Sequence, residues 1–141
     1  MEGKKIQKGI FILVFLMIPW FLGMGSSGSG SPDKIPVPAK KFKVVVVDQM
    51  DVVTEAQEAS IDGATFVEGK KGEGTFTVAF ENISSVVFFR KEGILTGNLK
   101  LRDGASQTLI LQGNKKLFGR TAYGTFQNPL SDMKKLTING R

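Results

Sequence analysis

The chain has 141 residues, with neither cysteine nor histidine, and its 19 basic and 13 acidic residues give a net charge of +6. The composition excludes disulfides, cysteine-ligated metals, lipid attachment to cysteine, and a histidine general base or metal ligand. The length allows one ordinary domain, which must be held by its apolar core alone, and the modest positive charge favours anionic partners.

The first 25 residues have the pattern of a secretory signal. Three lysines among residues 1–8 precede the apolar run 10–22, and small residues follow at Gly23 and Gly25. A membrane-spanning helix requires about 20 apolar residues, so this run is short for such a helix. We expect a signal helix removed after Gly25, with cleavage within 26–31 left open; the alternative is an uncleaved anchor over residues 9–24. Either reading predicts export to the periplasm or the extracellular space.

Residues 26–40 have the composition of a linker. Glycine and serine dominate its beginning and proline its end, so a flexible tether becomes a stiffer one. The folded part is then expected to begin at residue 41. Removing residues 1–25 leaves that mature chain with a net charge of +4.

From residue 42 onward the apolar residues follow the period of two typical of β-strands. Four consecutive valines in 42–47 predict a strand covered on both faces. Alternation in 75–80 predicts that Phe76, Val78 and Phe80 share an inward face, and the same pattern continues in 86–88, 99–101 and 109–111. Residues 54–60 are the one stretch that favours a helix, of one or two turns. Turn signals separate these runs at residues 62–63, 92–93, 103–104 and 112–114.

Residues 69–88 and 119–138 form an internal repeat at an offset of 50. The matching residues include Gly69, Gly74, Thr75, Phe76, Phe80, Ile83, Val86 and Phe88, which recur as Gly119, Gly124, Thr125, Phe126, Leu130, Met133, Leu136 and Ile138. The spacing of three from Ile83 to Val86 breaks the strand period and predicts a helical turn, capped by Asn82 and, in the second copy, Asp132. Upstream, 44–48 aligns with 99–103 at an offset of 55, which predicts an insertion of five residues in 50–58.

A β unit of about 50 residues buries too little surface to be stable alone. We therefore predict an all-β fold of two tandem repeats, residues 41–92 and 93–141, small-barrel or sandwich-like and packed as one compact unit. The valine strand and the pair Phe88–Phe89 are expected to contact the other repeat.

The second repeat resembles a known architecture. Its sequence runs from Leu99-Lys-Leu-Arg-Asp103-Gly104 through Phe118-Gly119 and Gly124-Thr-Phe126 to Leu136. This pattern is similar to the small-β-barrel, SH3-like repeats of uncharacterised bacterial exported proteins. The resemblance implies a fold in which a short helical turn precedes the final strand, and it implies no chemistry. The aromatic cluster with which SH3 domains hold proline-rich peptides is missing, so that function is not expected.

Three motifs with catalytic or ligand-binding precedents are better explained structurally. The glycine-rich stretch 69–74 lacks the Gly-Lys-Ser/Thr ending of a phosphate-binding loop, so we interpret it as a hairpin turn. Ser84, Ser85 and Ser106 have no histidine to activate them. Asp48, Asp51, Glu55 and Glu58 lack the spacing of a calcium loop, although a hydrolase using paired carboxylates within 48–58 remains the alternative function.

Basic residues near predicted turns and strand ends are the candidate binding site. They are Lys70, Lys71, Arg90, Lys91, Lys115, Lys116, Arg120, Lys134 and Lys135. Lys70 corresponds to Arg120 in the repeat, so two-fold packing would present cations at related positions. Nucleic-acid binding wants exposed aromatic residues for stacking, and Tyr123 is the one expected at the surface, so we expect no nucleic acid.

The favoured function is therefore a non-enzymatic, exported β-domain of the bacterial cell envelope. It is expected to bind a protein or an anionic polymer or lipid surface through basic turns and sheet edges. No cofactor or metal is expected, and a membrane contact is expected only through an uncleaved N-terminal segment.

Overall fold

Strands and two short 3₁₀ turns build the part of the chain that the computed structural model describes, residues 35–140, which confirms the all-β prediction. The expected signal segment and most of the expected linker lie outside the described residues. The first repeat contains β2 (Lys43–Asp48), β3 (Val53–Ile61), β4 (Phe66–Lys71), β5 (Gly74–Ala79), η3 (Phe80–Asn82) and β6 (Ile83–Lys91). The second contains β7 (Ile94–Leu101), β8 (Ser106–Ile110), β9 (Lys116–Thr121), β10 (Gly124–Pro129), η4 (Leu130–Asp132) and β11 (Met133–Gly140). No helix among these residues is long and apolar enough to cross a membrane.

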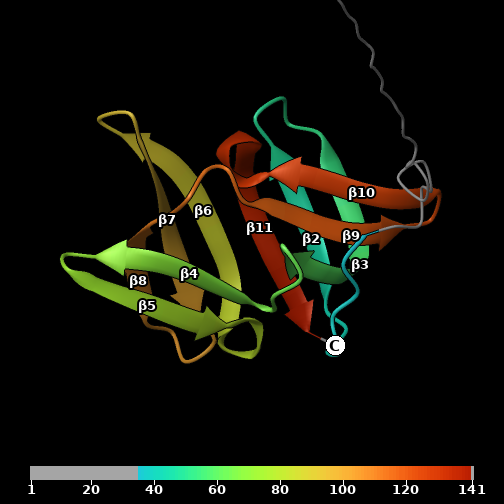
Figure 1. Cartoon of the computed structure of the whole chain (residues 1–141), viewed down its shortest axis with the longest axis horizontal. Coiled ribbons are helices and arrows are strands. Elements are labelled where there is room, and N and C mark those ends of the chain that lie inside the picture. The colour runs from blue at the N-terminus through green and yellow to red at the C-terminus, as the bar shows by residue number, and fades with distance from the viewer. Residues whose placement is uncertain (1–34, 141) are drawn as a thin grey trace, which may run out of the picture. The chain divides into compact units, whose positions relative to one another are not determined.

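The strands form one antiparallel sheet in the order β10-β9-β3-β2-β11-β6-β7-β8-β4-β5, which curls into a half-barrel (Figure 1). Each strand of the first repeat has a counterpart in the second: β2 and β7, β3 and β8, β4 and β9, β5 and β10, β6 and β11. If every strand is replaced by its counterpart, the result is the same strand order read from the opposite end of the sheet. The sheet therefore has a pseudo-two-fold axis, which passes between the neighbours β6 and β11. Val86 faces Leu136 across that axis, and these are the same position of the two repeats.

The two repeats exchange hairpins. The hairpin β4–β5 of the first repeat lies beside β8 of the second, and β9–β10 lies beside β3 of the first. The first strand, β2, also pairs with the last, β11. We call β10-β9-β3-β2-β11 the β11 half of the sheet and β6-β7-β8-β4-β5 the β6 half. Each half contains strands from both repeats.

A single cluster of buried apolar residues lies against the concave face of the curled sheet. Strand alternation places every second side chain there, and both repeats contribute, for example Val46 and Ile83 from the first and Leu99 and Leu136 from the second. Phe42 and Phe80 pack edge to face in this core with ring centroids 5.4 Å apart. The predicted shared core is thus present.

The repeat motif has a different local geometry from the one predicted. The 3₁₀ turns precede Ile83 and Met133, and no side chain caps either turn, so Asn82 and Asp132 are not caps. The spacing of three arises instead from an irregularity in strand pairing just after Ile83 and Met133. One extra residue on β6 or β11 shifts the alternation, so Ile83 and Val86 both face the core.

Three expectations for individual strands were wrong. Residues 54–60 belong to β3 rather than a helix, because pairing with β2 and β9 overrides local helix propensity. The valine strand is covered on one face only: Val44 and Val46 are buried, whereas Val45 and Val47 are half-exposed. Phe76 is 45% exposed, because β5 lies at the end of the sheet.

The predicted insertion at 50–58 was also misplaced. Val46 faces Leu136 while Leu99 faces Val86, so β2 and β7 correspond at an offset of 53 rather than 55. The turns after β2 and β7 have the same length and the same backbone hydrogen bonds. The first repeat is longer by three residues near the end of β3, where pairing with β9 is irregular and Glu58 adopts a left-handed φ of 54°.

Candidate functional site on the outer face of the sheet

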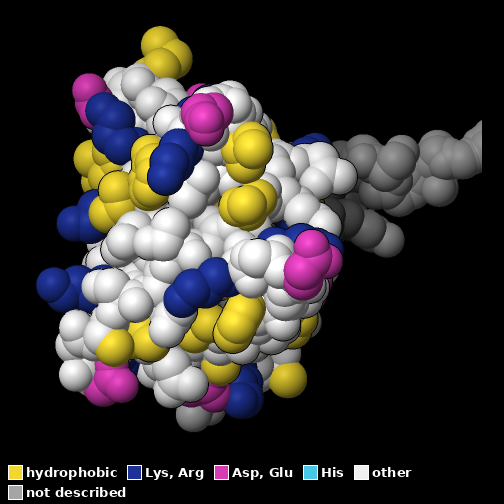
Figure 2. Space-filling model, turned by 90° about the vertical axis from the view of Figure 1, so that its left-hand side faces the viewer, with side chains coloured by type: hydrophobic (Ala, Val, Ile, Leu, Met, Phe, Trp, Pro, Cys, Tyr) yellow, Lys and Arg dark blue, Asp and Glu magenta, His cyan; other side chains and the backbone are white. Residues whose placement is uncertain are grey.

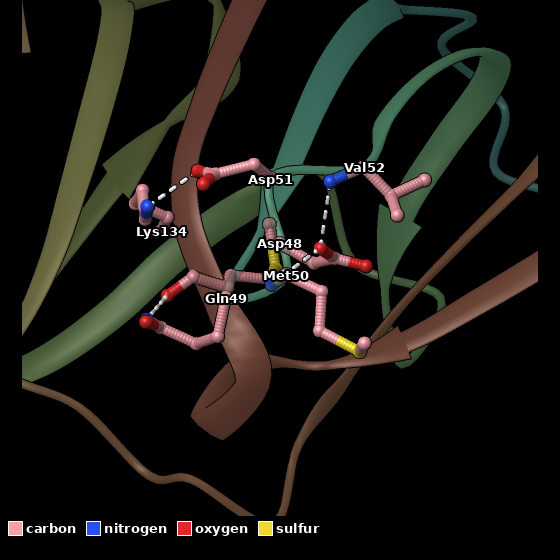
Figure 3. Close-up of polar contacts among 7 residues, drawn as sticks. Asp48, Gln49, Met50, Asp51, Val52 and Lys134 are labelled. Carbon is pink, nitrogen blue, oxygen red and sulfur yellow. Dashed lines mark hydrogen bonds and ion pairs between the residues drawn. The ribbon is translucent and has the colours of Figure 1, made fainter.

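The acidic turn between β2 and β3 is organised by its own hydrogen bonds (Figure 3). Asp48 Oδ1 accepts hydrogen bonds from the backbone N–H groups of Met50 and Val52, both at 2.9 Å. Asp51 pairs with Lys134 Nζ on β11 at 2.5 Å. Gln49 donates from Nε2 to the Met133 carbonyl at 2.9 Å. These contacts close the turn and fix it to β11, so its carboxylates have a structural role.

The remaining carboxylates of this stretch do not join Asp48 and Asp51 in a common site. Glu58 accepts a hydrogen bond from Arg120 Nε at 3.2 Å, and Glu55 lies exposed on β3. Within residues 35–140, no group of three or more acidic side chains could hold a metal ion. The geometry therefore offers no observation in favour of the alternative hydrolase.

The candidate basic residues lie near strand ends, and the structure does not gather them into one cluster. Five of them contact acceptors within the domain: Lys71 contacts Gln107, Arg90 the Gly93 carbonyl, Lys116 Gln127, Arg120 Glu58, and Lys134 Asp51. The other four have no side-chain partner among residues 35–140: Lys70, Lys91, Lys115 and Lys135. Three of these four lie on the convex, outer face: Lys70 on β4 and Lys91 on β6 belong to the β6 half, and Lys135 lies on the adjacent strand β11.

Strand pairing places apolar residues beside these three lysines. On the outer face, Phe89 of β6 lies opposite Thr96 of β7, Thr96 opposite Ile110 of β8, and Ile110 opposite Lys70 of β4. This row crosses four strands and spans about 14 Å at the usual strand separation. Lys91 lies opposite Ile94, and Lys135 lies opposite Val87. We call Val87, Phe89, Ile94, Ile110, Lys70, Lys91 and Lys135 the outer patch.

The four apolar side chains of the outer patch are 40–49% exposed. A shallow groove of about 220 Å³ crosses the patch beside Ile94 and Ile110, with Glu92 at its rim. Seen from the side that carries β4, β5, β7 and β8, exposed hydrophobic side chains lie next to lysines and arginines (Figure 2). None of these four residues was recognised from the sequence as part of a binding surface, and Phe89 was expected in contact with the other repeat. The signal was present, since inward Val86 and Phe88 require Val87 and Phe89 to point outward.

The equivalent positions of the β11 half are all polar. Val87 and Phe89 correspond to Thr137 and Asn139 at the repeat offset of 50, and Ile94 and Ile110 correspond to Lys41 and Gln57 at the offset of 53. The same scaffold position therefore folds with a polar residue in one half and an apolar residue in the other. The apolar character of the outer patch is not a requirement of the fold.

Other surfaces are less suited to an anionic partner. The strands at the sheet ends, β5 and β10, contain no lysine or arginine. A cleft of about 500 Å³ beside η4 borders the outer patch at Phe89, but its cations, Arg90 and Lys134, already contact oxygen acceptors of the domain. Tyr123 is fully exposed, as expected, but it stands alone at the tip of the β9–β10 hairpin. The outer patch is therefore the candidate site.

The chain belongs to a protein family described as an uncharacterised protein, whose model matches residues 38–141. That range coincides closely with the described β-domain and excludes the N-terminal apolar segment. No curated protein and no solved structure matches the chain.

Proposed function

We propose that the protein is a non-enzymatic β-domain, exported to the bacterial cell envelope, that binds an anionic partner through the outer patch. The observation that carries this proposal is the contrast between equivalent positions of the two sheet halves. Apolar side chains exposed without a folding requirement indicate an interaction surface. The lysines beside them give that surface a preference for negative charge.

Export is part of the proposal and is supported by the sequence of residues 1–25. Basic residues, a short apolar run and small residues follow one another there as in a secretory signal. The lack of cysteine fits a domain that is stabilised by its core in any redox environment. An intact mass measured on the protein from its native host tests cleavage, and a full-length mass in the membrane fraction would contradict it.

We further propose that each half of the sheet is a strand-exchanged, SH3-like barrel. In the β11 half, β2, β3, β9 and β10 lie side by side in that order, a 3₁₀ turn follows β10, and β11 returns beside β2. The β6 half repeats this arrangement with β7, β8, β4, β5, η3 and β6. This strand order supports the likeness, which would make the two outer faces comparable surfaces of two barrels.

The binding proposal is tested by transferring the polar residues of one half to the other. The variant Val87→Thr, Phe89→Asn, Ile110→Gln carries the residues of the equivalent positions in the β11 half. Full-length wild type and variant are immobilised and exposed to detergent-solubilised envelope extract at low and high salt. We expect wild type to retain protein or lipid phosphate in a salt-sensitive manner and the variant to retain much less.

The matched control changes the other half, with Gln57→Ala and Thr137→Ala. Residues 1–34 are the same in all three proteins, so their contribution cancels in the comparison. Circular dichroism and thermal unfolding establish that each variant is folded, and each exposed substitution is expected to change stability by about 1 kcal/mol or less. Equal retention by wild type and the exchanged variant would overturn the proposal.

A further inference from the structure

We infer that the anionic partner is the surface of a lipid bilayer, and that the outer patch docks on anionic phospholipid headgroups. This inference rests on the proposed function and specifies its partner. Phe89, Ile94 and Ile110 enter the boundary between headgroups and acyl chains, and Lys70, Lys91 and Lys135 lie among the phosphates.

The composition of the outer patch favours a bilayer over a protein. Protein interfaces are enriched in Tyr, Trp and Arg and depleted in Lys, and their energy concentrates in side chains that fill deep pockets. The outer patch has lysine as its only cation and combines it with Phe, Ile and Val. The groove beside Ile94 and Ile110 is shallow, at about 220 Å³. Apolar residues beside lysines are typical of surfaces that bind membrane interfaces.

The charge arrangement also fits headgroups. Lys70, Lys91 and Lys135 have no side-chain acceptor within residues 35–140, so their ammonium groups are available to phosphate oxygens. Each lysine stands next to an apolar residue across the strands: Lys70 beside Ile110, Lys91 beside Ile94, and Lys135 beside Val87. Lysine side chains extend along apolar surface and keep the charge at its rim. The apolar and ionic contacts are thus made together by one docked orientation.

The experiment uses the absence of cysteine from the chain, which makes any introduced cysteine a unique labelling site. Thr108→Cys lies on the outer face beside Ile110, and Glu55→Cys occupies the equivalent position of the β11 half. Each full-length variant receives an environment-sensitive fluorophore. It is then titrated with vesicles of phosphatidylcholine alone, or with about 30% phosphatidylglycerol added to supply a negative surface potential.

We expect the label at residue 108 to shift to shorter wavelength with the anionic vesicles and to respond little to the neutral ones. The label at residue 55 should respond to neither, and high salt should reverse the shift at residue 108. Because the readout is local, binding of residues 1–34 to the vesicles does not reproduce this difference. In the Thr108→Cys background, Lys70→Ala or Lys135→Ala should weaken binding about fivefold each, while Lys43→Ala, on β2 outside the outer patch, should not.

Two results would overturn the lipid inference. One is an equal response of the labels at residues 55 and 108, and the other is no response at residue 108 to anionic vesicles. If the pull-down still recovers a salt-sensitive acidic protein in the second case, the proposed function stands and only its lipid partner is wrong. If wild type and the exchanged variant also behave alike in the pull-down, both proposals fail.

Discussion

The two halves of the sheet are alike on the concave face and different on the convex one. Both halves place apolar residues of the same repeat positions in the core, such as Val86 and Leu136. On the outer face, the β6 half exposes Phe89 and Ile110 where the β11 half has Asn139 and Gln57. Folding therefore requires apolar residues on the inner face of both halves. It does not determine whether the residues at these outer-face positions are apolar or polar.

A second difference lies where the exchanged hairpins meet their partner strands. In the β11 half, β9 pairs with three residues of β3, and Arg120 contacts Glu58. In the β6 half, the pairing of β4 with β8 is confined to Lys70 and Ile110, and Lys70 has no acceptor within residues 35–140. In the β11 half, Arg120 is thus paired within the fold, whereas in the β6 half the equivalent residue Lys70 is exposed to solvent.

Separating the repeats should break both halves at once and gives the largest expected effect. Fragment 1–92 loses β11 beside β2, β8 beside β4, and both neighbours of β6, and fragment 93–141 suffers the equivalent losses. Neither fragment should show cooperative thermal unfolding by circular dichroism when expressed alone. A cooperatively folded first repeat would show that the exchange of hairpins is dispensable.

Replacing Gly69 and Gly119 by alanine compares the two exchanged hairpins directly, because these glycines lie where the hairpins contact β8 and β3. A Cβ on Gly69 would lie 2.7 Å from Leu109 Cβ and 2.8 Å from the Ile110 carbonyl oxygen. A Cβ on Gly119 would lie 2.9 Å from Ala56 Cβ and 3.2 Å from the Gln57 carbonyl oxygen. Each substitution should lower the free energy of unfolding by about 1–3 kcal/mol. We expect Gly69→Ala to have the larger effect, because its contact with backbone is the closer one.

Denaturant unfolding measures this difference, with Thr75→Ala on the exposed strand β5 as a control. Unchanged stability in both glycine variants would mean that the hairpins do not approach β3 and β8 as closely as described.

Neutralising either of two partly exposed ion pairs of the β11 half should have the smallest effects. The side chains of Arg120 and Glu58 are 33% and 29% exposed, so solvent screens the pair in part. Glu58→Gln should lower the free energy of unfolding by about 0.5–1 kcal/mol, and the difference should shrink in high salt. Asp51→Asn removes the more exposed pair with Lys134 and should cost less. An equal or greater loss from Asp51→Asn in thermal unfolding would contradict this ranking.

The local features of the fold were predictable because they depend on near neighbours in the sequence. Alternation over 86–88 and 109–111 identified core residues, and Asp62-Gly63 and Glu92-Gly93 marked real turns. The hairpin interpretation of 69–74 was confirmed as the turn between β4 and β5. The misassigned helix at 54–60 shows the limit, because its strand geometry comes from two neighbouring strands.

The candidate site was predictable only in part. Its lysines were recognised as candidates, and so was the correspondence of Lys70 with Arg120. Ile110 was missed because it joins the patch by pairing with Thr96 on β7 and with Lys70 on β4, which is forty residues away in the sequence. Ile94 was also missed, although it pairs with Lys91 across the short β6–β7 turn.

By itself, the sequence determined an all-β chain with a duplicated unit, since side-chain alternation, glycine turns and a constant offset are local properties. The tertiary structure alone decided that the repeats exchange hairpins around an axis at Val86 and Leu136, and that three lysines and four apolar residues share one outer surface. Backbone hydrogen bonds between strands form with most side chains, so the sequence of one strand does not determine which strand it pairs with. That choice is made by the packing of the common core.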